Sequence, residues 1–209
     1  MGLSTAQQPL RIGLFGGAFD PPHNAHVALA QAALAQLKLD VLHVVPTGDA
    51  WHKPRALTAA KHRMAMCQLV FQSMARVLVD DMELQRQGPS YTVDTLAQLR
   101  ERYADAQFFV VLGLDQAARF TQWHQSQQIL EWAQLAMADR PVEGDAPAST
   151  AEWHNPRHVQ LKMPLMALSA TDIRQRCQTG ADLSSYLSPA VIHYIQTNHL
   201  YLDQHDRSL

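Results

Sequence analysis

The chain has 209 residues, 47% of them hydrophobic, which is enough for one substantial core. Its net charge of −2 gives no overall basic field that would attract a nucleic-acid backbone or an anionic membrane. Cys67 and Cys177 fit no metal-binding pattern, so we expect a protein without disulfides in a reducing compartment, the cytoplasm. No apolar stretch is long enough for a membrane span, and residues 1–9 do not resemble a signal peptide.

Strand and helix patterns alternate along the chain. Short apolar runs predict strands over residues 10–15, 41–45, 77–79, 108–112, 135–138 and 159–163. Helical spacing and capping residues predict helices over 25–37, 59–73 (capped by Thr58), 92–103, several turns up to 132, 171–177, and 189–198 (capped by Ser188). This alternation predicts an α/β fold, a Rossmann-like doubly wound parallel sheet with helices on both faces.

The organisation predicted is a single domain over residues 10–209, with a C-terminal helical segment and a disordered tail over residues 1–9. Residues 141–156, rich in Pro, Ala, Ser and Thr, are expected to form an exposed loop. In such a sheet, ligands bind outside the carboxyl ends of the strands at the switch point of the strand order. The residues that follow the strands are therefore the candidates for a site.

The most informative segment is Gly13-Leu-Phe-Gly-Gly-Ala-Phe-Asp-Pro-Pro-His-Asn-Ala-His26. Gly16 and Gly17 follow the first predicted strand, and we expect them to let the backbone turn sharply and approach a ligand. His23 and His26 stand at the start of the next helix, where unpaired amides attract anions and the positive helix end disfavours protonated histidine. The spacing fits neither G-x-G-x-x-G nor a Walker A loop, and a zinc site would lack a third ligand.

A second segment, Ser169-Ala-Thr-Asp-Ile-Arg174, precedes another helical stretch. Ser169 with Asp172 fits a capping box. Arg174 falls in the first turns, where the helix dipole disfavours a cation. A bound polyphosphate would reverse that preference, because Ser169, Thr171, the free amides and Arg174 would all contact one anion.

Both segments resemble signatures of a known family. Residues 16–26 are similar to the signature of H-x-G-H nucleotidyltransferases and, more closely, of bacterial nicotinate-mononucleotide adenylyltransferases, with Ala25 where the family usually has glycine. Residues 168–174 resemble the second signature, Ile-Ser-Ser-Thr-x-x-Arg, with Leu168 and Ala170 as departures. The resemblance extends from residue 10 to residue 201. It implies transfer of the adenylyl group of ATP to nicotinate mononucleotide, giving deamido-NAD and pyrophosphate.

The resemblance also implies roles for individual residues. Those implied in catalysis are His23, His26, Lys53 and Arg174. Those implied in ATP binding are Gly16, Gly17, Ala18, Phe19, His23, His26, Gly113, Asp115, Ser169, Thr171 and Arg174, with Asp115 contacting ribose hydroxyls. Those implied in binding nicotinate mononucleotide are Lys53, Ser90, Tyr91, Thr92, Trp123 and Arg140, with Trp123 stacking on the ring. No resident metal is expected, and Mg²⁺ is expected to arrive with ATP.

Three alternatives stay open. The first is a sister adenylyltransferase using nicotinamide mononucleotide or phosphopantetheine, although Trp123 and the segment Ser90-Tyr91-Thr92 argue against the latter. The second is a non-catalytic nucleotide-binding domain. The third is a fragment related to class I aminoacyl-tRNA synthetases, against which the net charge and the lack of an anticodon-binding region count. The sequence also leaves open whether the chain forms a homo-oligomer.

Overall fold

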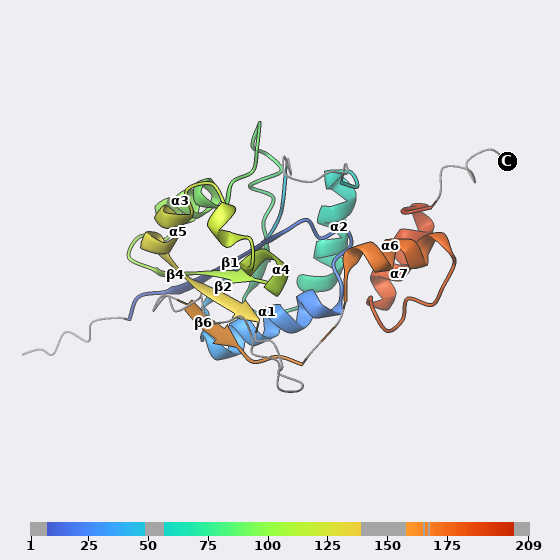
Figure 1. Cartoon of the computed structure of the whole chain (residues 1–209), viewed down its shortest axis with the longest axis horizontal. Coiled ribbons are helices and arrows are strands. Elements are labelled where there is room, and N and C mark those ends of the chain that lie inside the picture. The colour runs from blue at the N-terminus through green and yellow to red at the C-terminus, as the bar shows by residue number, and fades with distance from the viewer. Residues whose placement is uncertain (1–7, 49–56, 139–157, 165, 167, 203–209) are drawn as a thin grey trace, which may run out of the picture.

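The computed structural model describes residues 8–48, 57–138, 158–164, 166 and 168–202. Its centre is a six-stranded sheet in the order β3-β2-β1-β4-β5-β6, with every neighbouring pair parallel (Figure 1). The strands are β1 (Arg11–Gly17), β2 (Val41–Pro46), β3 (Val77–Val79), β4 (Gln107–Leu112), β5 (Ala133–Ala138) and β6 (His158–Leu161). The order reverses between β1 and β4, so the switch point lies between the carboxyl ends of these two strands.

Helices cover both faces of the sheet, as the sequence predicts. One apolar cluster joins α1 (Asn24–Gln36) and α2 (Ala60–Phe71) to the sheet, and a second joins α3 (Thr92–Arg102), α4 (Leu114–Ala117), the 3₁₀ helix η1 (Phe120–Gln122) and α5 (Ser126–Trp132) to it. In β4, Phe109 packs in the first cluster while Phe108 and Val110 pack in the second. A strand buried on both sides explains why β4 reads as a continuous apolar run.

The C-terminal helices pack on α2 rather than on the sheet. The helices α6 (Ala170–Gln178) and α7 (Pro189–Thr197) form a third cluster around Ile173, Val191 and Ile195, which includes Met66 of α2 and no strand residue. In Figure 1 they form the orange and red end of the molecule, beside α2 and one end of α1. Among the described residues, no helix has the length and apolar character that a membrane crossing requires.

Four local predictions differ from the structure. The helix α2 begins after Ala59, which makes no side-chain cap, so the predicted cap by Thr58 is wrong; the backbone N–H of Thr58 instead donates to the Asp20 carboxylate (3.2 Å). The predicted turn at Gly16 and Gly17 is also wrong, because both continue β1 and pair with β2. Toward the β6 edge of the sheet, β5 begins two residues before the predicted 135, and β6 covers His158–Leu161 rather than 159–163. The predicted loop over 141–156 lies outside the described residues.

A buried histidine fastens the edge of the sheet to α3. His43 of β2 is 0% exposed, and its Nδ1 contacts Asp80 Oδ2 (3.0 Å) while its Nε2 contacts Tyr103 Oη (3.0 Å). Arg102 Nη1 donates to the same Asp80 oxygen (2.8 Å). The hydrogen bond with His43, together with Arg102 and against the opposing effect of burial, lowers the pKa of Asp80 to about 2.

Asp80→Asn should lower the free energy of unfolding at pH 7 by about 2 kcal/mol. The pKa of Asp80 in the folded chain lies below its unfolded value of about 3.9, so this stabilisation is complete above that pH and is lost as pH falls toward 2. Urea unfolding over this range should therefore show the wild type and the variant converging in acid. Asp81→Asn, which removes a carboxylate bonded to Gln85, is the matched control. A constant difference down to acid pH would contradict the assignment.

Candidate active site

The loop between β1 and α1 turns at Phe19. This residue has a φ of 47° and a side chain that is 1% exposed, and its ring packs on Phe15 (centroids 5.3 Å apart) and Phe71 (6.0 Å). A Cβ on Gly17 would stand 3.1 Å from the Phe19 ring, whereas a Cβ on Gly16 would meet nothing within 4 Å. The chain therefore needs a small residue at Gly17 because an aromatic ring lies against it, while the backbone at Gly16 is open to a ligand.

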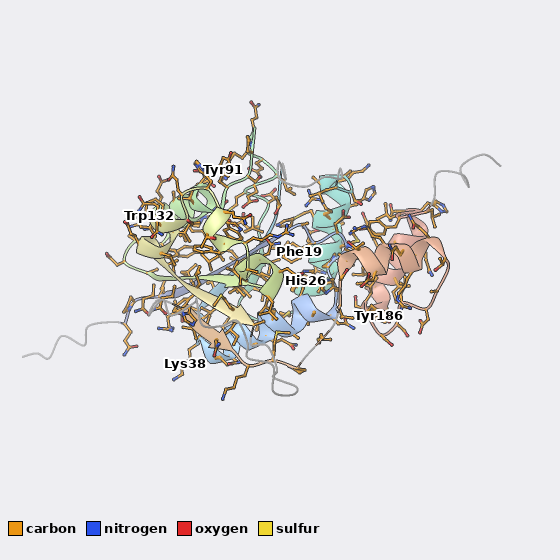
Figure 2. The ribbon with its side chains drawn as sticks, viewed as in Figure 1. Phe19, His26, Lys38, Tyr91, Trp132 and Tyr186 are labelled. Carbon is orange, nitrogen blue, oxygen red and sulfur yellow. The ribbon has the colours of Figure 1, made fainter. Side chains whose placement is uncertain are left out.

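The two histidines occupy the first turn of α1. His23 is the N-cap, and its backbone N–H donates to Nδ1 of His26 (3.1 Å), so the neutral His26 ring carries its hydrogen on Nε2. The His23 and His26 rings stack with centroids 3.7 Å apart, and the His26 ring lies 5.0 Å from that of Phe19. Figure 2 labels Phe19 and His26 next to each other, near the start of α1. The helix start thus presents oriented imidazole groups, as the sequence predicts.

Burial, rather than the helix end alone, keeps His23 neutral. The residue is 7% exposed, and this desolvation lowers its pKa to about 4. The expectation that His23 is a neutral group thus agrees with the structure, but the physical cause expected from the sequence was incomplete. The free amides expected at this helix end are also fewer, because the N–H of Asn24 donates to the carbonyl of Tyr186 (2.9 Å).

Residues 18–26, from the end of β1 through the first turn of α1, are called the histidine loop below. The second predicted segment contacts this loop directly. Ser169 is the N-cap of α6, and its Oγ accepts from the N–H of Asp172 (3.2 Å). Arg174 Nη1 donates to the carbonyl of Asp20 (2.9 Å), and its Nη2 donates to Thr171 Oγ1 (3.0 Å). The structure therefore brings the start of α6 to the start of α1, although the two residues in contact are 154 apart in sequence.

The residues after β4 lie on the other side of the switch point. Gly113 is the N-cap of α4, and Asp115 stands exposed in its first turn. Because β4 is the direct neighbour of β1, this helix start and the histidine loop leave the same edge of the sheet from adjacent strands. The placement is compatible with ribose contacts by Asp115, which stay a prediction.

Residues predicted to bind nicotinate mononucleotide, called the acceptor segment below, lie at the start of α3. Tyr91 is its N-cap and Thr92 its first residue, and the Tyr91 ring lies 4.3 Å from that of His124. The preceding residue, Trp123, is half-buried and packs on Phe120 at 5.5 Å. In the view of Figure 2, His26 lies between Tyr91 and Tyr186, so the acceptor segment and the C-terminal segment are on different sides of the histidine loop.

A buried carboxyl behind the acceptor segment is absent from the sequence-based prediction. Glu83 is 5% exposed and accepts a hydrogen bond from Thr95 Oγ1 of α3 (2.7 Å). Burial raises its pKa, and hydrogen bonds from Thr95 and from the backbone of Gly48 oppose that shift. A Cβ on Gly48 would stand 2.8 Å from Ser90 Oγ. Glu83 and Gly48 thus hold the end of β2 close to the start of α3.

Two predicted site residues, Lys53 and Arg140, lie outside the described residues. Within the part of the chain that the structure describes, no three His, Cys, Asp or Glu side chains gather as a metal site would require. The two cysteines are free and buried.

Comparison with known proteins agrees with this geometry. A sequence model of the cytidylyltransferase-like family matches residues 14–176, which include both predicted signatures. This chain belongs to that family. It is 49% identical to a probable nicotinate-nucleotide adenylyltransferase of Albidiferax ferrireducens over 91% of this chain and 98% of the relative. It is 42% identical to the protein of the same name from Bordetella petrii, again over 91% and 98%. The family predicted from the sequence is thereby confirmed.

The fold also has a solved counterpart. The nicotinic acid mononucleotide adenylyltransferase of Plasmodium falciparum, in a structure complexed with NaAD, superposes with a TM-score of 0.75, covering 92% of this chain and 97% of that chain at 20% identity. At this identity the likeness establishes the fold. The doubly wound sheet of this chain therefore has the nucleotidyltransferase type of fold.

The titration of His23 tests the described geometry without any substrate. The pKa of His23 in the folded chain lies below its ordinary value of about 6.5. Between about pH 4 and 6.5 the unfolded chain therefore binds a proton at His23 that the folded chain does not. Lowering the pH through this range consequently destabilises the fold. NMR of the imidazole protons should show one histidine titrating near pH 4, and His23→Asn should remove that signal. A His23 signal that titrates near 6.5 would contradict the burial.

Proposed function

We propose that this protein transfers the adenylyl group of ATP to nicotinate mononucleotide, releasing pyrophosphate and forming deamido-NAD. The observation that carries the proposal is the contact of Arg174 with the loop that bears His23 and His26. It brings a cation, two imidazoles and the starts of α1 and α6 together at the switch point, which is where an α/β sheet binds nucleotides. The names of the relatives, up to 49% identical, support the choice of substrates.

The proposed reaction needs alignment and charge neutralisation rather than a strong base. A phosphate monoester has a second pKa near 6, so the attacking phosphate of the mononucleotide is already ionised at neutral pH. Attack on the α-phosphorus of ATP in line with the departing pyrophosphate then requires positioned donors around the phosphorus and the leaving group. His23, His26, Arg174 and the helix ends supply such donors, and Lys53 is proposed to join them.

The two histidines suit this task because they are neutral. The Nε2–H of His26 is fixed by the bond that its Nδ1 accepts, and burial of His23 holds that ring neutral. Oriented neutral N–H groups can donate hydrogen bonds to the phosphate oxygens and so stabilise the negative charge that develops on them. Because the rings are neutral, the positive end of the helix does not repel them. Arg174, already bonded to Asp20 and Thr171, supplies the formal positive charge. Mg²⁺ is proposed to enter as the ATP complex, where it would neutralise part of the triphosphate charge.

The acceptor is proposed to bind at the start of α3. The amides beside Tyr91 and Thr92 would donate to the nicotinate carboxylate, which the N-terminal end of a helix favours, and Trp123 would stack on the ring. Further ATP contacts are proposed from Asp115 and Ser169, and a further phosphate contact from Arg140. Buried, free Cys67 and Cys177 fit the reducing cytoplasm that we propose as the location.

Pyrophosphate release measured in parallel tests both the reaction and the acceptor. With ATP, nicotinate mononucleotide should turn over at least about tenfold faster than nicotinamide mononucleotide, because only the acid offers a charge to the amides at the start of α3. Faster turnover of the amide would overturn the acceptor. ATP binding without pyrophosphate release for either would favour a non-catalytic nucleotide-binding domain.

His23→Ala and His26→Ala should each lower kcat by about 10²–10³ and raise the KM for ATP far less, because their donors act on charge that develops in the transition state. The matched control is His193→Ala, since this exposed histidine of α7 hydrogen-bonds, among the described residues, to the Thr197 hydroxyl alone and lies away from the histidine pair. Steady-state kinetics with varied ATP separates the two parameters. Unchanged turnover in both site variants would remove the histidines from the mechanism.

A further inference from the structure

The C-terminal segment contacts the carboxylate of the histidine loop. Tyr201 follows α7, and its Oη donates to Asp20 Oδ1 (2.8 Å), a residue 181 positions earlier. Asp20 is 2% exposed, so this hydrogen bond is shielded from water. Burial, together with the charge of Asp20, raises the pKa of Tyr201, so its hydroxyl is protonated and can donate at neutral pH.

A buried arginine of α2 holds the same loop from the other side. Arg63 is 2% exposed; its Nη1 donates to the carbonyl of Ala18 (3.0 Å) and its Nε to the carbonyl of Thr58 (2.8 Å). The N–H of Thr58 in turn donates to the second carboxylate oxygen of Asp20 (3.2 Å). The carboxylate thus accepts from Tyr201 on one oxygen and from Thr58 on the other, and Arg63 bonds the carbonyl of Ala18, just before the turn.

These contacts bear on a residue with an unfavourable backbone conformation. Phe19, between Ala18 and Asp20, has the positive φ of 47°, a conformation that a bulky residue rarely adopts and that its surroundings must hold in place. His23 follows three residues after Asp20 and begins α1. A shift of the loop is therefore passed to both imidazoles and to the helix start.

We infer that Tyr201 and Arg63 are positioning residues for adenylyl transfer: through Asp20 and Ala18 they hold the histidine loop in the orientation that the reaction uses. This inference rests on the proposed function. Arg63 is not a candidate for phosphate contact because it is 2% exposed. Tyr201 is not one because its hydroxyl lies on the Asp20 carboxylate, whose negative charge would repel a phosphate. Misplacement of reacting groups by about 1 Å is enough to slow a reaction by about a hundredfold.

The chain offers a matched control for the Tyr201 hydroxyl. Tyr194 of α7 makes a similar hydroxyl contact, to Nδ1 of His62 on α2 (3.0 Å), and it also joins the C-terminal helices to α2. It differs in that, within the described part of the chain, His62 makes no hydrogen bond to the histidine loop. Tyr201→Phe and Tyr194→Phe therefore remove equivalent groups, one with and one without a connection to Asp20.

Tyr201→Phe should lower kcat by about tenfold while the KM for nicotinate mononucleotide stays within about twofold, and Tyr194→Phe should leave both within about twofold. Hydrogen exchange of residues 18–26 in the substrate-free protein should quicken in Tyr201→Phe and not in Tyr194→Phe. Arg63→Lys, which keeps the charge but not the forked geometry, should behave as Tyr201→Phe does.

The outcomes separate this inference from the proposed function. If the wild type turns over and Tyr201→Phe matches it in rate and in exchange, or if both tyrosine variants lose the same activity and the same protection, the positioning role is overturned. If the wild type releases no pyrophosphate, the proposed function fails, and the exchange comparison still decides whether Tyr201 orders the loop.

Discussion

The bond from Arg174 to the carbonyl of Asp20 is the interaction on which the site depends, because it joins elements from opposite ends of the chain. The loop that begins α1 carries neutral imidazoles, and the start of α6 carries the cation. Charge and directional N–H donors are thereby supplied by different residues. A site for a polyphosphate and an anionic acceptor needs this division, since cations neutralise charge while neutral donors define where the phosphorus must stand.

Two buried ionic groups stabilise this arrangement although each is costly alone. Arg63 and Asp20 are both 2% exposed, and burial lowers the pKa of the guanidinium while the charge of Asp20 opposes that shift. Each is bonded to backbone groups as well, so neither charge is left without partners in the interior. The same bonds hold the left-handed backbone at Phe19, which explains how the loop keeps an unfavourable φ without a glycine there.

The sequence predicted the sheet, both helix starts of the site and the family, because these depend on local patterns: apolar runs, cap residues and a dense string of glycine, proline and histidine. It did not predict Tyr201, Arg63 or Glu83, whose roles arise from contacts between distant segments. Arg63 shares the buried face of α2 with Met66 and Cys67, and a cation on an apolar face was the one available signal. The turn was predicted at Gly16 and Gly17 because glycine is common in turns. In the structure the small size of Gly17 instead makes room for the Phe19 ring.

The bond between Tyr201 and Asp20 also has a consequence for synthesis of the protein. A ribosome makes the first strand and its loop early, but the donor for Oδ1 of that loop is produced only after 181 further residues. A nascent or prematurely terminated chain can form much of the sheet, since its strands are complete by β6. The histidine loop of such a chain lacks the donor to Oδ1 of Asp20, so under the proposed positioning role the loop reaches its final orientation only late in translation.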